Sequence, residues 1–360
     1  MENQAPSVDG VVGVWRAVDA SANRAAEALR VVEDVARFVL DDGHSTALAR
    51  DLRHELAAVL AGDPLRHRCS LRDVAGDVGA GMRSGQALPR ASTTDLVAAN
   101  SARAAQALRS LEECAAVVAP DAAHRFERLR YGVYGLERRI LTCARAQERL
   151  AGIDLCVLVD GRRDGAEFAR LVAGLAEAGV RMFQVRDKGL DVPAVVDRVR
   201  RALDVVRARD PHDPALVIVN DRADVAAALN AAGVHTGADD MPTRLVRRVI
   251  GPAALSGRTA HDVAEARAAV ADGADYLGVG PCFPSTTKSF DTQAPAEFLR
   301  AVAAEVALPV YAIGGITLER LDAVAALGIR RVAVASAVTA AADPAAAAAA
   351  FIERLARLRG

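Results

Sequence analysis

The feature that most constrains the fold is a regular alternation, from Ile153 onward, of short β-branched runs with amphipathic stretches of helix length. Eight runs are expected to be strands, spanning residues 154–160, 181–186, 215–220, 233–236, 253–257, 275–280, 309–313 and 331–335. Near-continuous apolar runs are typical of parallel strands that are buried on both faces. The alternation therefore predicts an α/β fold, a closed (β/α)8 TIM barrel over residues 149–360, with an open doubly wound sheet as the alternative.

The first part of the chain, residues 1–148, has helical spacing instead. Residues 24–36 carry an apolar stripe that recurs 79 residues later in residues 103–115, with Arg30 and Glu33 matched by Arg109 and Glu112. Each copy is followed by a second apolar-periodic segment, residues 48–60 and 126–140. The repeat predicts an all-α domain made of duplicated helical hairpins that pack as four helices.

Composition narrows the classes of partner. Hydrophobic residues make up 52% of the chain, which is enough for packed cores, and the formal net charge is -1 at pH 7. A near-neutral chain without a basic face argues against a nucleic-acid partner. No run of about 18 apolar residues occurs, so no membrane partner is expected. The cysteines are scattered and lack CxxC spacing, which indicates buried thiols. From these features together we expect a cytoplasmic protein.

Polar residues gather where the expected strands end. Gln184, Arg186 and Lys188 follow the second strand, Asn220 and Asp221 the third, His235, Asp239 and Asp240 the fourth, Thr259 and His261 the fifth, residues 285–288 the sixth, Gly314 and Gly315 the seventh, and Ser336 the eighth. Lys188 and Lys288 are the only lysines among 45 basic residues. Because the carboxyl ends of barrel strands share one mouth, these side chains are expected to converge there.

A magnesium and diphosphate site is the chemistry that these charges favour. Asp221 and Asp240 offer hard carboxylate oxygens, and Mg²⁺ usually takes one or two protein carboxylates together with substrate phosphate oxygens and water. Arg186, Lys188 and Lys288 suit the remaining phosphate oxygens, arginine as a bidentate fork and lysine as a point charge. Such a site stabilises the charge that develops on a departing diphosphate.

A second anion site is expected across the mouth. Hydroxyls, backbone N–H groups and a closely approaching glycine backbone can hold a monophosphate, and the candidates are Ser285, Thr286, Thr287, Gly315 and Ser336. Asn220 carries a donor and an acceptor on one amide, which suits the edge of a heterocycle, although an Asx turn is the alternative.

The motifs QVRDK, VNDRADVA, GVHTGADD, ADYLGVGPCFPSTTK, VYAIGGI and VAVASAV resemble those of the thiamine-phosphate synthases in order and spacing, over about residues 153–358. The resemblance implies a Mg²⁺-dependent transferase of thiamine biosynthesis that joins hydroxymethylpyrimidine diphosphate to hydroxyethylthiazole phosphate. It also implies that a pyrimidine cation forms before the thiazole nitrogen attacks. Thiamine phosphate and diphosphate are the implied products.

The same resemblance implies roles for individual residues. It assigns the pyrimidine diphosphate to Gln184, Arg186, Lys188, Asn220, Thr259 and Lys288, Mg²⁺ to Asp221 and Asp240, and the thiazole phosphate to Ser285, Thr287, Gly315, Ala335 and Ser336. Thr259 stands where the family usually has serine, and Ser285 stands where it usually has threonine. Both departures keep the hydroxyl, so we expect an active enzyme.

Two other functions fit parts of the barrel. A thiazole tautomerase or a regulatory barrel would bind the thiazole phosphate without needing the full diphosphate set. A Schiff-base enzyme would use Lys288 as its nucleophile, which requires a desolvated amine. The polar and cationic neighbours of Lys288 in the sequence favour phosphate contact instead.

The helical half resembles a domain fused ahead of some thiamine-phosphate synthases, which implies phosphorylation of hydroxymethylpyrimidine phosphate. A nucleotide-phosphate and metal site is one hypothesis, with Arg24, Arg30, Arg72, Asp73 and Asp77 as its candidates. The alternative is a scaffold or a module for homo-oligomerisation, in which Arg30 and Glu33 form a surface ion pair and residues 72–81 are a linker. No P-loop motif supports the kinase hypothesis from the residues alone.

Overall fold

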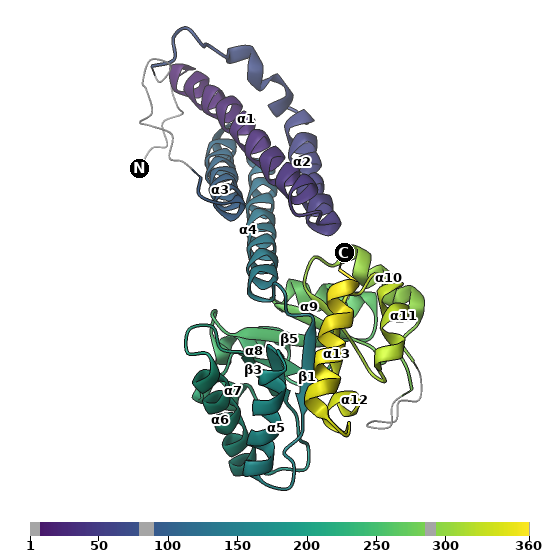
Figure 1. Ribbon diagram of the computed structural model, residues 1–360. Helices are drawn as coiled ribbons and strands as arrows, with labels where there is room; N and C mark the ends of the chain where they lie inside the picture. The colour runs from purple at the N-terminus through teal and green to yellow at the C-terminus, as the bar shows by residue number, and fades with distance from the viewer. Residues whose placement is uncertain (1–7, 79–89, 285–292, 360) are drawn as a thin grey trace. The chain divides into compact units, whose positions relative to one another are not determined.

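The computed structural model describes residues 8–78, 90–284 and 293–359, and the chain divides into two compact units, Met1–Ala144 and Arg145–Gly360. The first unit is helical and the second is an α/β barrel (Figure 1). Within the described residues, no helix combines the length and the apolarity needed to cross a membrane.

The helical unit contains four long helices. They are α1 (Val8–Phe38), α2 (Gly43–Ala61), α3 (Thr93–Val118) and α4 (Pro120–Arg149), with a 3-10 helix, η1 (Leu65–Leu71), after α2. Asp42 caps α2 by accepting a hydrogen bond from the Ser45 N–H, and Ser92 caps α3 in the same way. The last five residues of α4 belong to the second unit.

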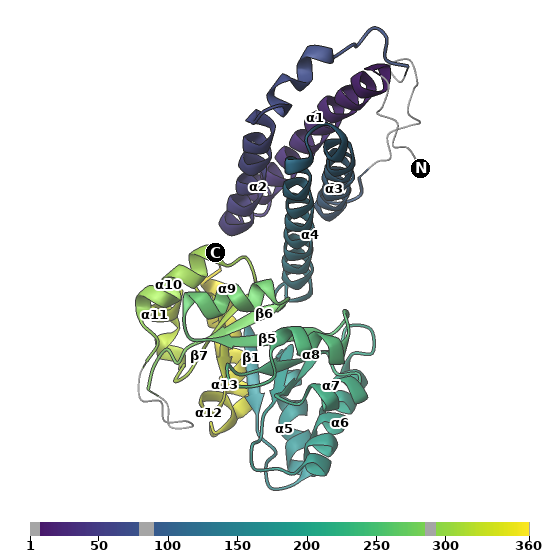
Figure 2. The same ribbon diagram turned by 180° about the vertical axis from the view of Figure 1, so that it is seen from behind.

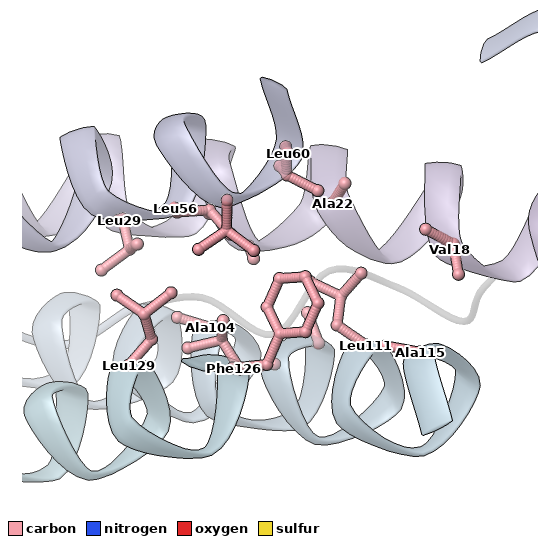
Figure 3. Close-up of a cluster of buried hydrophobic side chains, with 14 of the residues drawn as sticks. Val18, Ala22, Leu29, Leu56, Leu60, Ala104, Leu111, Ala115, Phe126 and Leu129 are labelled. Carbon is pink, nitrogen blue, oxygen red and sulfur yellow. The ribbon is translucent and has the colours of Figure 1, made fainter. Parts of the chain in front are cut away.

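The sequence repeat places equivalent residues of α1 and α3 in one core. Leu29 and Leu108 are both fully buried there, and Leu56 of α2 and Phe126 of α4 pack in the same cluster. Figure 3 shows α1 and α3 in opposite directions, with Leu29 near Ala104 and Val18 near Ala115. Beyond the stripe, Phe38 at the end of α1 and Val39 after it are exposed.

The two copies also pair their charges in the same way. Glu33 of α1, 2% exposed, accepts a hydrogen bond of 2.8 Å from Arg53 of α2. Its counterpart Glu112 of α3 accepts one of 3.1 Å from Arg130 of α4. The expected pair of Arg30 with Glu33 is present at 3.9 Å, and the Arg30 side chain is exposed. The Glu33 carboxylate, however, is buried between two helices, where Arg53 lies closer to it.

The second unit is a closed barrel of eight parallel strands in sequence order. These are β1 (Leu155–Val159), β2 (Met182–Val185), β3 (Leu216–Asn220), β4 (Gly233–Thr236), β5 (Leu255–Ala260), β6 (Tyr276–Val279), β7 (Val310–Ile313) and β8 (Arg331–Val334). Pairing of β1 with β8 closes the barrel. The (β/α)8 prediction is confirmed, and the open sheet is excluded.

Helices surround these strands (Figure 2). They are α5 (Gly165–Glu177), α6 (Val192–Arg209), α7 (Ala223–Ala228), α8 (Thr243–Ile250), α9 (Val263–Ala271), α10 (Ala296–Glu305), α11 (Leu321–Ala325), α12 (Ser336–Thr339) and α13 (Pro344–Arg357), with a 3-10 turn, η2 (Leu318–Arg320), before α11. Asp164, Asp191, Asp262 and Asp343 cap α5, α6, α9 and α13 through their carboxylates.

The amino ends of the barrel strands carry paired charges. Asp275, fully buried before β6, accepts hydrogen bonds from Arg145 at 2.7 Å and from the Ser256 N–H at 2.7 Å, and it also pairs with Arg247. A cavity of about 590 Å³ at this end is lined in part by the ion pair of Arg181 with Asp213. Paired charges at this face are typical of a stabilising role.

Candidate active site

A second cavity of about 590 Å³ opens at the carboxyl ends of the strands. Every described residue of the expected binding set lines it: Gln184, Arg186, Lys188, Asn220, Asp221, Asp240, Thr259, Gly315, Ala335 and Ser336. The other four candidates, Ser285, Thr286, Thr287 and Lys288, lie outside the described residues. The convergence of the ten follows from parallel strand direction, because every strand of the barrel ends at this mouth.

The Asp221 backbone is held in a conformation that few non-glycine residues adopt. Its φ is +60°, in the left-handed region, and its N–H donates to the His235 carbonyl oxygen at 2.8 Å. Such strain persists where the surrounding structure enforces it, and it clusters at functional sites. Here it turns the chain sharply at the end of β3, so that the carboxylate lines the cavity.

Asp240 is held by its own loop and by Arg258 of β5. The Gly237 N–H donates to the Asp240 Oδ2 at 2.9 Å. The Arg258 guanidinium donates to the carbonyl oxygens of Ala238 at 2.7 Å and Met241 at 3.0 Å. These bonds fix the loop after β4, and thereby the position of the Asp240 carboxylate.

The two carboxyl groups interact directly, and their pKa values move apart. Burial and the hydrogen bond and charge of Asp240 raise the pKa of Asp221. Burial opposes ionisation of Asp240 as well, but hydrogen bonds from Asp221 and the Gly237 N–H outweigh it and lower the pKa of Asp240. The Lys188 Nζ lies 3.7 Å from Asp221. Two facing carboxylates that resist joint ionisation form a site that suits a divalent cation.

The donor set fits Mg²⁺ better than a transition metal. Among the residues that the structure describes, no group of three or more His, Cys, Asp or Glu side chains could hold a metal. Mg²⁺ needs only one or two carboxylates when substrate phosphates and water complete its shell. Asp221 and Asp240 are therefore the residues that would hold it.

The opposite side of the mouth is built from backbone. Gly314 and Gly315 have φ values of +93° and +61°, and a side chain at Gly315 would lie 2.3 Å from the Pro284 carbonyl oxygen. Only glycine fits this turn, and Gly315 lines the cavity together with Ala335 and Ser336. Ser336 is the first residue of α12.

The sequence does not assign a role to two residues that line the cavity, His235 and Arg320, or to Arg258 behind the Asp240 loop. Arg320 lines the cavity, donates to the Gly315 carbonyl oxygen at 2.6 Å and stacks over the Phe283 ring. His235 was recognised only as a polar strand end, and Arg258 was not singled out. The roles of His235 and Arg258 depend on how β4 pairs with β5, and Arg320 lies in a turn that carries no motif.

In the described part of the helical unit, several of the candidate residues form ion pairs with other residues. Arg72 donates to both Asp19 oxygens, at 2.6 and 2.8 Å, and Arg30 pairs with Asp34 at 3.1 Å. Asp73 pairs with Arg16 at 3.9 Å. Arg24 is exposed on α1. Asp77 lies after η1, and it has an interaction partner of its own.

Comparison with protein-family models matches each unit to a different family. Residues 155–338 match the model described as thiamine monophosphate synthase. Residues 16–139 match the ThiD2 family. The first match covers the barrel through α12, and the second covers most of the helical unit.

Curated relatives match over both units. A thiamine-phosphate synthase of Gloeobacter violaceus is 40% identical over 344 residues, which are 96% of this chain and 97% of the relative. A thiamine-phosphate synthase of Rhodopirellula baltica is 36% identical over 333 residues, 90% of this chain and 88% of the relative. Both relatives therefore span nearly the whole length of the chain.

A solved structure matches the barrel. The thiamine phosphate pyrophosphorylase of Pyrococcus furiosus is 31% identical with a TM-score of 0.51, and the match covers 58% of this chain and 98% of that one. The match thus spans nearly all of that structure but leaves a large part of this chain unmatched.

Proposed function

The chain belongs to the thiamine-phosphate synthase family, and we propose that its barrel joins hydroxymethylpyrimidine diphosphate to hydroxyethylthiazole phosphate with the help of Mg²⁺. The observation that carries the substrate assignment is the charge arrangement of the mouth. Two interacting carboxylates lie beside Lys188, and Arg186 lines the same cavity. This arrangement suits a magnesium diphosphate.

The described residues divide the work as follows. Arg186 and Lys188 bind the diphosphate oxygens, and Asp221 and Asp240 bind Mg²⁺, which neutralises charge on the leaving group when it is bound. Gln184 and Asn220 bind the pyrimidine edge. The bond between the pyrimidine methylene carbon and the diphosphate oxygen breaks, and the oxygen keeps the electron pair. A bond from the thiazole nitrogen to the same carbon then forms.

Positioning supplies the second contribution. Gly315, Ala335 and Ser336 hold the thiazole phosphate, so that the ring nitrogen faces the methylene carbon. Holding both reactants in one cavity removes much of the entropic cost of their encounter. The apolar side chains of Leu158 and Ile313 line the same cavity and limit the access of water, which would otherwise compete with the thiazole for the cation.

The decisive test supplies both phosphorylated heterocycles and Mg²⁺ to the full chain and measures thiamine phosphate and diphosphate. We expect the two products in equal amounts, with formation abolished by excess EDTA and restored by added Mg²⁺. Folded protein that makes no thiamine phosphate would reject the proposed function. Product formation that is indifferent to EDTA would reject the magnesium assignment alone.

A second candidate function concerns the helical unit. The match of residues 16–139 to the ThiD2 family supports the alternative in which this unit phosphorylates hydroxymethylpyrimidine phosphate. That reaction would produce the diphosphate that the barrel consumes. The scaffold or homo-oligomerisation alternative is supported by the ion pairs of Arg72 and Arg30.

The kinase and scaffold roles of the helical unit can be distinguished in a full chain whose barrel has been inactivated by a substitution. The Asp221→Asn variant is incubated with hydroxymethylpyrimidine phosphate, ATP and Mg²⁺, and the phosphorylation of the pyrimidine is followed by ³¹P NMR. Accumulation of the pyrimidine diphosphate supports the kinase. Its absence, with α1–α4 folded by circular dichroism, supports the scaffold.

A further inference from the structure

His235 occupies a slot inside the barrel that two glycines create. Its ring lies against Gly257 of β5 and Gly278 of β6, where an added Cβ would be 2.5 Å from Nδ1 and 3.1 Å from Cε1 respectively. The Tyr276 ring packs against it with centroids 5.4 Å apart. The residue is 7% exposed, so the imidazole cannot turn without a change in the core.

The two ring nitrogens have different surroundings. Nε2 lies 3.0 Å from the Thr259 Oγ1, and Thr259 lines the cavity beside His235. Nδ1 is buried and has no hydrogen-bond partner within the part of the chain that the structure describes. A neutral imidazole carries one N–H, on either Nε2 or Nδ1.

The position of that single hydrogen determines what the Thr259 hydroxyl can do. A hydrogen on Nδ1 would be a buried N–H with no acceptor among the described residues, which is rare and unfavourable in folded proteins. A hydrogen on Nε2 is instead donated to the Thr259 oxygen. The Thr259 oxygen then accepts from the ring and cannot donate to it. The Thr259 hydroxyl hydrogen can therefore be donated into the cavity.

We propose that His235 is a positioning residue: its Nε2–H donates to the Thr259 oxygen and thereby presents the Thr259 hydroxyl hydrogen to the diphosphate of the pyrimidine substrate. The inference rests on the proposed function for the identity of that substrate. It adds a residue to the diphosphate site that does not itself touch the substrate. It also explains why positions 257 and 278 are glycines, because a side chain at Gly257 or Gly278 would occupy the space of the ring.

The tautomer can be tested without any substrate. The chain is labelled with ¹⁵N-histidine, and the signals of the seven histidines are recorded between pH 5 and 8. The His235 signal is assigned by its loss in His235→Gln. We expect the Nε2–H tautomer wherever the ring is neutral. An Nδ1–H tautomer overturns the proposal whatever the enzyme's activity.

The consequence for binding is tested by a double-mutant cycle. His235→Phe keeps a ring but removes the donor, and Thr259→Val removes the hydroxyl. Each is expected to weaken inhibition by inorganic diphosphate, and to lower kcat/KM for the pyrimidine diphosphate, by about tenfold to a hundredfold, the range for a hydrogen bond to a charged group. The double variant should be no worse than Thr259→Val, and KM for the thiazole phosphate should not change.

Conservative variants and stability separate positioning from simple packing. His235→Gln can donate through its amide, so it is expected to restore most of what His235→Phe loses, and Thr259→Ser should stay within about threefold of the parent chain. Thermal unfolding of all variants identifies any loss that follows from misfolding. Losses that multiply in the double variant, or a Thr259→Val variant that binds diphosphate normally, overturn the proposal. Neither result would affect the proposed reaction, provided that the parent chain makes thiamine phosphate.

Discussion

The helical unit and the barrel mouth use charged residues in opposite ways. In the helical unit, Glu33 and Asp19 are almost completely buried, and each is matched by arginines at 2.8 and 2.6 Å. In the mouth, Asp221 faces another carboxylate with Lys188 3.7 Å away, and Arg186 forms no ion pair with any described residue. Charges that the protein pairs internally stabilise a fold, whereas charges that it leaves unbalanced are available to a ligand.

The largest expected effect comes from removing one mouth carboxylate. Asp221→Asn should lower thiamine phosphate formation by about two to three powers of ten, because Mg²⁺ loses a ligand. Thermal stability should stay the same or rise, since burial and Asp240 already disfavour the charge and asparagine tolerates a φ of +60°. Activity and melting temperature are measured on the same preparation.

Asp239→Asn is the matched control, because this carboxylate lies beside Asp240 without being an expected Mg²⁺ ligand. It should leave the rate of product formation within about threefold of the parent, as expected for a charge that binds neither Mg²⁺ nor phosphate. Equal losses in both variants would mean that Asp221 acts only through the overall charge of the mouth.

In the helical unit, replacing a carboxylate by an amide should lower stability and leave the activity of the barrel unchanged. Glu33→Gln leaves Arg53 and Arg50 without their buried partner and should destabilise this unit by about 3 kcal/mol, with no change in the barrel's coupling rate. Trp15, the single tryptophan, packs against the core of this unit, so its fluorescence during urea unfolding reports the loss.

Glu112→Gln is the corresponding change in the second copy of the repeat. The Glu112 side chain is 16% exposed against 2% for Glu33, so solvent replaces part of the lost pairing and the loss should be smaller. A Glu33 variant as stable as the parent would remove the contrast between the two units.

Acidification should weaken the barrel through His235. Its pKa is about 4 in the folded chain, against about 6.5 when unfolded, so between these values the unfolded state binds more protons. The stability that this neutral ring contributes is complete above pH 6.5 and is lost as pH falls, by about 2 kcal/mol at pH 5. This loss of stability is measured by hydrogen exchange of the backbone amides of β4 and β5 as a function of pH, in the parent chain and in His235→Gln. Identical pH dependence in the two chains would contradict this account.

The smallest effect is expected from a change that keeps the charge. Lys188→Arg should lower coupling by about tenfold, because the planar fork cannot take the position of the compact ammonium between Asp221 and the diphosphate. Steady-state rates at saturating thiazole phosphate measure it. Arg181→Lys, in an exposed ion pair at the opposite end of the barrel, is the control and should have no effect. A normal rate for Lys188→Arg would show that only the charge matters there.

The sequence predicted the repeat but not its pairing. The match between residues 24–36 and 103–115 indicated two similar helices, and both Leu29 and Leu108 are in the core. It did not indicate that Glu33 would be buried against Arg53, because that contact depends on how α1 packs against α2. Spacing within one helix shows which residues share a face, but not which residue of another helix lies opposite.

The sequence alone determined the barrel and the composition of its mouth. Strand and helix periods are local properties, and parallel strands bring their carboxyl ends to one face whatever the details of packing. Only the tertiary structure decided the left-handed turn at Asp221, the hydrogen bonds of Arg258 to the Asp240 loop and the hydrogen bond between His235 and Thr259. These depend on the register between β4 and β5 and on the space that Gly257 and Gly278 leave free, and no single segment of sequence contains that information.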